Sequence, residues 1–251
     1  MDEVLYEVRD RTATITLNRP GKRNALTQAG LDALAAHIRA AEGDDAAWVI
    51  AIRARGEDFC IGQDVADLAR EDRSGDFFAP VLQALDQARK PVVCAARGES
   101  RGGGAGVLLG ADIRLVGASA RIGWLHARMG IASISGPATL ARAVPKNIAY
   151  EMMFTCDYLD AARAHALGVV NHVIDDAGLD AALDATLAKV LANAPLAIRA
   201  MKEATQSTLD LPYAEAVARA RAILGGVMPS EDAREGLRAM REGRPPQWRG
   251  R

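Results

Sequence analysis

Two glycine-containing turns have the composition of a site that stabilises a negatively charged oxygen. One is Cys60-Ile61-Gly62-Gln63-Asp64, and the other begins with Gly102-Gly103-Gly104. Each follows a segment with the composition of a strand. Glycine lets the backbone approach a ligand closely, and bare N–H groups at such a turn or at a helix N-terminus attract an anion. If both turns face one target, two converging amides form an oxyanion hole.

The second glycine run has rival interpretations. A phosphate-binding P-loop is excluded because no Lys-Ser or Lys-Thr follows the glycines. A dinucleotide-binding fingerprint is excluded because Val107 stands where a third Gly or Ala is needed. Gly98-Glu99-Ser100-Arg101-Gly102 fits the G-x-S-x-G pattern of a serine hydrolase, although the last histidine is His172, far from the chain end. Tight strand-to-helix packing is the alternative without chemistry.

The elements around these turns predict an α/β fold. Alternating apolar residues over 4–18 predict a hairpin of two strands. Thr27 is suited to cap a helix that Gly43 ends. Strands alternating with loops and helices indicate a parallel sheet covered on both faces. The same patterns predict strands over 48–53, 91–96, 113–116 and 169–174, helices over 77–88 and 102–110, a mostly helical chain from Pro145 onward, and a tail, 244–248, that docks or frays.

Composition excludes several functional classes. The 251 residues, enough for one large or two modest domains, carry 31 basic and 32 acidic side chains, so no net charge favours nucleic acid. The apolar stretches are shorter than the roughly 20 residues of a membrane helix, and the first residues lack the features of a signal peptide. We therefore expect a cytoplasmic protein with no membrane partner. Cys60, Cys94 and Cys156 are spaced neither as a zinc site nor as a disulfide framework.

Further motifs accompany the two glycine turns along the chain: Asn18-Arg19-Pro20, Asn24-Ala25-Leu26, Phe59 to Asp64, Lys90-Pro91-Val92, Gly102-Gly103-Gly104, Ala111-Asp112-Ile113, Leu167 to Asn171 and Arg244-Pro245-Pro246. Taken together, these motifs resemble those of the crotonase superfamily, also called the enoyl-CoA hydratase/isomerase family. The resemblance implies a ClpP/crotonase-like α/β fold, a spiral of ββα units, over residues 1–195. It also implies a C-terminal helical region over 196–251 that serves oligomerisation and covers the CoA site, and hence a homo-oligomer, either a trimer or a dimer of trimers.

The same resemblance implies an acyl-CoA thioester as the substrate. Coenzyme A is then part of the substrate, and no separate cofactor or metal is expected. The backbone amides of Gln63 and Gly103 would hold the thioester oxygen. The residues that would line the CoA nucleotide are Lys22, Arg23, Ala25, Leu26, Gln63, Asp64 and Val65.

The sequence departs from the family pattern at the positions of the catalytic acids and bases. Two positions that hold glutamates in hydratases hold Gly106 and His126, and the position of an isomerase carboxylate holds Ile134. Histidine exchanges protons near neutral pH, so His126 is the candidate proton shuttle. The alternative is a structural histidine between Leu125 and Ala127. Ordinary enoyl-CoA hydration is therefore not the expected reaction.

Several alternatives follow from this departure. Within the superfamily they are a retro-Claisen C–C hydrolase and a ring or double-bond isomerase. From other classes they are a serine hydrolase built on Ser100 and a non-catalytic acyl-CoA binder. Glu99 and Ser100 are secondary candidates for the site. His37, His165 and His172 are expected to be structural or solvated, and Asp64 with Asp67 is expected to be a helix N-terminal charge pair.

Overall fold

The computed structural model, which describes residues 2–64, 66 and 77–251, begins with the predicted hairpin. Strands β1 (Val4–Arg9) and β2 (Thr12–Leu17) pair antiparallel, with Val4 opposite Leu17. Asp10 and Arg11 between them both have positive φ, 48° and 65°. Two left-handed residues give the connection the twist that a two-residue hairpin needs.

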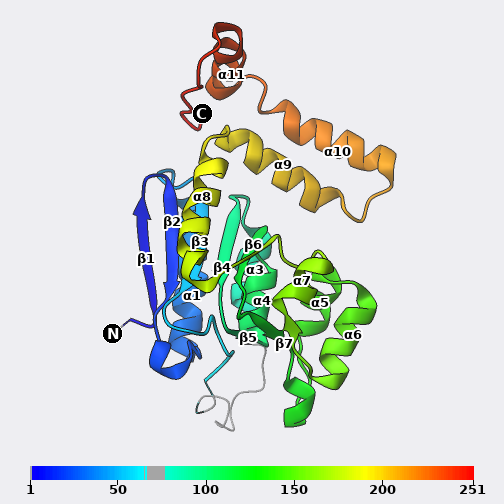
Figure 1. Ribbon diagram of the computed structural model, residues 1–251. Coiled ribbons are helices and arrows are strands. Elements are labelled where there is room, and N and C mark those ends of the chain that lie inside the picture. The colour runs from blue at the N-terminus through cyan, green and yellow to red at the C-terminus, as the bar shows by residue number, and fades with distance from the viewer. Residues whose placement is uncertain (1, 65, 67–76) are drawn as a thin grey trace.

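The main sheet continues from β2 in parallel (Figure 1). Its order is β1-β2-β3-β4-β6-β9, and every pair after the hairpin is parallel. The central strands are apolar on both faces, as strands covered on both sides must be. The added strands are β3 (Val49–Ala54), β4 (Val92–Ala96), β6 (Ile113–Gly117) and β9 (His172–Ile174).

Helices cover both faces of this sheet. Helices α1 (Gln28–Gly43), α3 (Ala79–Gln87) and α4 (Gly103–Leu109) pack on one face and form the larger core with it. Helix α8 (Leu179–Leu191) covers the other face through Leu179, Leu183 and Leu187 (Figure 1). The Thr27 hydroxyl caps α1 by accepting from the Gly30 amide at 3.2 Å, as predicted.

A second sheet of three short strands was not predicted. Strand β5 (Glu99–Arg101) pairs parallel with β7 (Arg121–Gly123), which pairs antiparallel with β8 (Leu159–Asp160). Because β5 directly precedes α4, this sheet fixes the entry into the second glycine turn. The turn is therefore held by β5, which precedes it, and by β7, whose Gly123 carbonyl accepts from the Gly102 amide at 2.9 Å.

The last strand is shorter than predicted. We expected a strand over 169–174, but β9 begins at His172. Gly168 has φ +69°, and the Arg114 guanidinium donates to the Val169 carbonyl at 2.9 Å, so a side chain occupies a backbone acceptor at the start of the expected strand. The remaining elements before the C-terminal region are η1 (Pro20–Lys22), η2 (His126–Met129), α5 (Gly136–Ala143), α6 (Lys146–Thr155), α7 (Ala161–Ala166) and η3 (Asp176–Gly178).

The last three helices extend away from the sheets (Figure 1). They are α9 (Pro195–Thr208), α10 (Tyr213–Gly225) and α11 (Glu231–Glu242). No residue of α10 is buried, and Tyr213 within it is 86% exposed. This region confirms the predicted helical end of the chain.

No single helix among the described residues has the length and apolar character to cross a bilayer. One pair of segments, Asp176–Leu191 and Pro195–Thr208, meets those criteria only when both are taken together, and the pair is bent by 97°.

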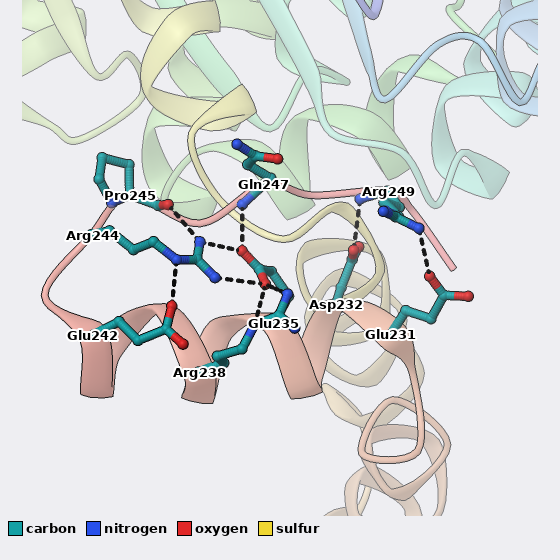
Figure 2. Close-up of polar contacts among 9 residues, drawn as sticks. All are labelled: Glu231, Asp232, Glu235, Arg238, Glu242, Arg244, Pro245, Gln247 and Arg249. Carbon is teal, nitrogen blue, oxygen red and sulfur yellow. Dashed lines mark hydrogen bonds and ion pairs between the residues drawn. The ribbon is translucent and has the colours of Figure 1, made fainter.

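After α11 the chain folds back along that helix (Figure 2). The Glu235 carboxylate accepts from the Arg244 guanidinium at 2.6 Å and from the Gln247 amide at 3.0 Å. The Asp232 carboxylate accepts from the Arg249 amide at 2.7 Å. Two carboxylates of α11 therefore bind the backbone of the tail.

The tail also contacts the body of the protein. The Trp248 indole donates to the Ala192 carbonyl at 2.8 Å, and a Cβ added at Gly236 would lie 3.2 Å from the Trp248 ring. Gly250 packs against the Trp48 ring, with 3.3 Å between an added Cβ and the indole nitrogen. Of the two outcomes left open for the tail, the structure shows docking.

We predict that Glu235→Gln loosens this tail. Hydrogen bonds from Arg244, Gln247 and Arg238 lower the pKa of Glu235, so the charged acceptor is present at neutral pH and its contribution is lost only as the pH falls through that lowered pKa. Hydrogen–deuterium exchange over 244–251 should accelerate on the order of tenfold.

The control for this prediction is Glu231→Gln. Glu231 forms longer ion pairs with Arg249 and Arg251, at 3.5 and 3.3 Å. Equal exchange in both variants would show that Glu235 does not hold the tail.

Candidate active site

The two glycine turns lie against each other. The Arg101 amide donates to the Cys60 carbonyl at 2.9 Å, and the Cys60 amide donates to the Glu99 carbonyl at 3.1 Å. A Cβ added at Gly104 would lie 2.2 Å from the Cys60 carbonyl oxygen. Gly62 has φ +98°, and a Cβ there would lie 3.3 Å from the Arg101 carbonyl oxygen. The turns, about 40 residues apart in sequence, therefore form one backbone unit, as the oxyanion-hole hypothesis requires.

The amide of Gln63 is directed away from its neighbouring segment. Leu26 pairs with the residues on either side of Gln63: its amide donates to the Gly62 carbonyl at 2.9 Å, and its carbonyl accepts from the Asp64 amide at 2.9 Å. In a parallel bridge the residue between such partners points its own N–H to the opposite side. No described residue accepts from the Gln63 amide. Its side-chain Nε2 is also buried without a partner in the described part of the chain.

The amide of Gly103 is the second available donor. Gly103 is the first residue of α4, where backbone N–H groups have no acceptor within the helix. Within residues 2–64, 66 and 77–251, no group accepts from it. A Cβ at Gly103 would lie 2.1 Å from the Phe78 ring, so only glycine fits. The sequence did not reveal Phe78 as the residue that covers this turn.

His126 lies against the second glycine turn. Gly102 has φ +50°, and a Cβ there would lie 2.9 Å from His126 Cε1. The imidazole is therefore beside the residue that precedes Gly103. His126 begins η2, is partly exposed, and its ring centre lies 5.8 Å from that of Trp124. The structure thus brings His126 to the turn, and Gln63 and Gly103 lie on the two adjoining turns.

The space near Gly106 is occupied by apolar side chains. A Cβ added at Gly106 would lie 3.0 Å from Leu82 and 3.7 Å from the buried Trp124 ring. A larger side chain here would require Leu82 to shift. Ile134, at the other position without a carboxylate, is 68% exposed. Trp124 therefore lines this region, although nothing in the sequence pointed to it beyond its position two residues before His126.

The segment predicted to line CoA has an unusual backbone held by a buried asparagine. Arg23 and Asn24 both have positive φ, 53° and 54°. Asn24 is fully buried; its Nδ2 donates to the Arg55 carbonyl at 2.9 Å and to the Asp58 carbonyl at 2.8 Å. Asparagine tolerates this left-handed region better than most residues. The result is a rigid corner beside the first glycine turn.

The residues predicted to line the CoA nucleotide differ in how exposed their side chains are. Lys22 and Arg23 are exposed, whereas the side chains of Ala25 and Leu26 are buried. Only the first two therefore have exposed side chains, and the Arg23 guanidinium is already engaged by Asp58 at 2.6 Å and Glu99 at 3.2 Å.

Asp64 is held beside that segment by an arginine. The Arg19 guanidinium donates to its carboxylate at 2.5 Å and lowers the pKa of Asp64. Asp64 is therefore charged at neutral pH. Val65, also predicted for the CoA site, and Asp67 lie outside the described residues.

The secondary candidates occupy strand β5. Ser100 is 1% exposed and pairs with Ile122 in the small sheet, so it lies inside a strand rather than at a strand-to-helix turn. Glu99 faces a group of basic side chains and accepts a hydrogen bond from the Tyr158 hydroxyl at 3.0 Å. Tyr158, 59 residues away, carried no signal in the sequence.

Two recesses lie away from the glycine turns. One, of about 440 Å³, lies beside the hairpin and is lined by Arg53, Arg55 and Arg97 among others. The other, of about 630 Å³, lies at α11 and the tail. Neither is lined by the candidate catalytic residues. No group of three or more His, Cys, Asp or Glu side chains among the described residues is arranged to hold a metal ion.

Comparison with known proteins places the whole chain in one group. Residues 7–251 match the family model described as enoyl-CoA hydratase/isomerase. The chain is 30% identical to the enoyl-CoA hydratase EchA19 of Mycobacterium tuberculosis, over 99% of this chain and 97% of that protein. It is also 30% identical to the 2,3-dehydroadipyl-CoA hydratase of Escherichia coli, over 100% of both.

Solved structures agree with the sequence comparison. A crystal structure of an enoyl-CoA hydratase/isomerase from Mycobacterium paratuberculosis matches with a TM-score of 0.90 and 32% identity, covering 100% of this chain and 99% of that one. That of the enoyl-CoA hydratase EchA1 from Mycobacterium marinum matches with a TM-score of 0.92 and 31% identity, covering 100% of both chains.

The environment of Cys60 predicts an unreactive thiol. Burial raises the pKa of Cys60 to about 12, so roughly one thiol in 10⁴ is ionised at pH 8. Iodoacetamide at pH 8 should leave Cys60 unmodified in the native protein, whereas it should label all three cysteines after denaturation, as mass spectrometry would show. Rapid native labelling of Cys60 would mean that the first glycine turn opens to solvent.

Proposed function

Because this chain belongs to the enoyl-CoA hydratase/isomerase family, we propose that it polarises an acyl-CoA thioester through the amides of Gln63 and Gly103, with His126 as the proton shuttle. The observation that carries the proposal is the meeting of the two glycine turns, each with an amide that no described group occupies. The family match supports the class of substrate, because it indicates an acyl-CoA enzyme.

The chemistry follows from the instability of an enolate. An α-proton of a thioester leaves slowly unless the oxygen that becomes negative is stabilised. Each preorganised N–H donor aimed at that oxygen typically contributes about 3 kcal/mol in the transition state. Amides fixed by strand pairing and by a helix start need no rearrangement as the charge develops. Gln63 and Gly103 would therefore lower the barrier to enolate formation.

The fate of the enolate depends on the proton donor beside it. His126 lies at the second turn, where an imidazole can remove a proton and return it. Gly106 and Ile134 carry no acid, and the space near Gly106 is lined by Leu82. This supports a reaction with one proton-transfer group, such as isomerisation or retro-Claisen cleavage, over hydration by a pair of carboxylates.

Lys22 and Arg23 are suited to meet the phosphates of coenzyme A. Both are exposed cations at a rigid corner adjoining the first glycine turn. Ala25, Leu26, Asp64 and Val65 would complete this part of the site. Coenzyme A enters as part of the substrate, and no further cofactor is proposed.

The C-terminal helices support an oligomeric assembly. Large apolar side chains on these helices and on the loops between them are exposed in the single chain, which supports a surface that another subunit covers. We propose a trimer or a dimer of trimers, formed by residues 196–251, in the cytoplasm. The exposed side chains are Met201, Leu209, Leu211, Tyr213, Val217, Leu224 and Met228.

The first test removes one amide of the hole. Proline has no N–H and is compatible with the first position of a helix, so Gly103→Pro should remove only the donor. Its Cβ would meet Phe78, so the test is made in a Phe78→Ala background, with Gly103→Ala as the matched control that keeps the N–H. Exchange of the α-protons of butyryl-CoA in D₂O, followed by NMR, should fall on the order of 10²–10³-fold for proline relative to alanine. Equal rates would remove the Gly103 amide from the mechanism.

The second test addresses the proton shuttle. His126→Ala should slow the same exchange by about 10²-fold or more, while the affinity for CoA measured by calorimetry stays unchanged. His172→Ala, at an exposed histidine in β9, is the control and should exchange at the native rate. If His126→Ala exchanges at the native rate, another group is the base. If the native protein binds the thioester without any exchange, the chain is an acyl-CoA binder.

A further inference from the structure

We propose that Glu99 is the positioning residue of the oxyanion hole, joining the two glycine turns and the CoA-binding corner into one unit. This inference rests on the proposed function and adds to it a residue that does not touch the substrate. It follows from the contacts of the Glu99 carboxylate, of the Glu99 backbone and of Tyr158.

The Glu99 carboxylate lies among basic donors from three parts of the chain. It accepts from the Arg101 guanidinium in a short contact and from the Tyr158 hydroxyl at 3.0 Å. It also pairs with Arg23 at 3.2 Å and with Arg121 at 3.9 Å. Its side chain is only 16% exposed. Partial burial strengthens these interactions relative to those of a surface ion pair.

These contacts suit a positioning role better than proton transfer. Burial alone would raise the pKa of Glu99, but the hydrogen bonds from Arg101 and Tyr158 outweigh it, and the pKa is lowered. The carboxylate is therefore charged at neutral pH, and its oxygens are already engaged. It is a poor base and a stable anchor.

The backbone of Glu99 holds the first glycine turn. Its amide donates to Asp58 Oδ1 at 2.8 Å, and its carbonyl accepts from the Cys60 amide at 3.1 Å. The other oxygen of Asp58 accepts from Arg23 Nε at 2.6 Å. Arg23 therefore bridges Asp58 and Glu99, and so connects the CoA-binding corner to both turns.

Tyr158 extends the network to the second glycine turn. Its ring packs on Gly123, where an added Cβ would lie 2.7 Å from Tyr158 Cε1. The Gly123 carbonyl accepts from the Gly102 amide at 2.9 Å, which fixes the residue before Gly103. The Arg121 guanidinium lies over the Tyr158 ring, 4.2 Å from its centre. Loss of the Tyr158–Glu99 hydrogen bond would therefore change the position of the Gly103 amide.

The experiment measures polarisation of a bound thioester carbonyl. The probe is butyryl-CoA labelled with ¹³C at the thioester carbon, observed by infrared difference spectroscopy in the native protein, Glu99→Gln and Tyr158→Phe. Glu99→Gln removes the charge at constant shape, and Tyr158→Phe removes only a hydroxyl, so it keeps the test valid if the first variant folds poorly. Glu151→Gln is the control. It also removes a carboxylate charge from an ion pair, the one between Glu151 of α6 and Arg163 of α7 at 2.6 Å.

We expect the carbonyl band to shift to low frequency in the native protein and in Glu151→Gln, and to shift less in both network variants. Exchange of the α-protons should fall about tenfold or more in those two variants, while the dissociation constant for CoA changes less than about twofold. A native-like band and native-like exchange in Glu99→Gln and Tyr158→Phe would overturn the positioning role. A native protein that binds the probe without any band shift would overturn the oxyanion hole itself, and the role of Glu99 with it.

Discussion

The structure of the site depends on how closely two backbone segments approach each other. At Gly104 the distance to the Cys60 carbonyl leaves no room for a Cβ, and at Gly103 the Phe78 ring occupies the same space. At Gly102 the limit is set by the His126 imidazole. Three consecutive glycines are therefore required by three different neighbours. Their common effect is to leave backbone amides as the groups that face the site.

The main sheet explains why these segments meet at all. Strands β3 and β4 are parallel neighbours, so the chain leaves both at the same edge of the sheet. The first glycine turn comes after β3, and the second comes after β4 and the short strand β5. Open α/β folds place their ligand sites at this edge for the same reason. The small sheet then adds precision, because β5 pairs with β7 just before the second turn.

Sequence periodicity was sufficient to predict the elements that have one face toward the core and one toward solvent, such as β1, β2 and α1. It failed for β5, because Glu99, Ser100 and Arg101 are polar and their strand is made by distant partners. The glycine turns were recognisable because glycines that directly follow a strand-like segment serve few purposes besides a close approach of the backbone. Phe78 and Tyr158 were not, since their importance comes from contacts with residues 25 and 59 positions away. Only the folded chain brings those residues together.

The charge beside the proposed oxyanion hole would be favourable for an enolate despite the acid residues there. Asp58 and Glu99 are both negative, and a bare carboxylate near the developing oxyanion would oppose its formation. Arg23, Arg101 and Arg121 contact Glu99, and Arg23 also contacts Asp58, so the cluster made of these five residues has one excess positive charge. The two acids thus hold three cations near the glycine turns, and the excess positive charge of the cluster would favour a negative oxygen there. Removing a charge from this cluster would alter both the geometry of the turns and the electrostatic potential at the amides.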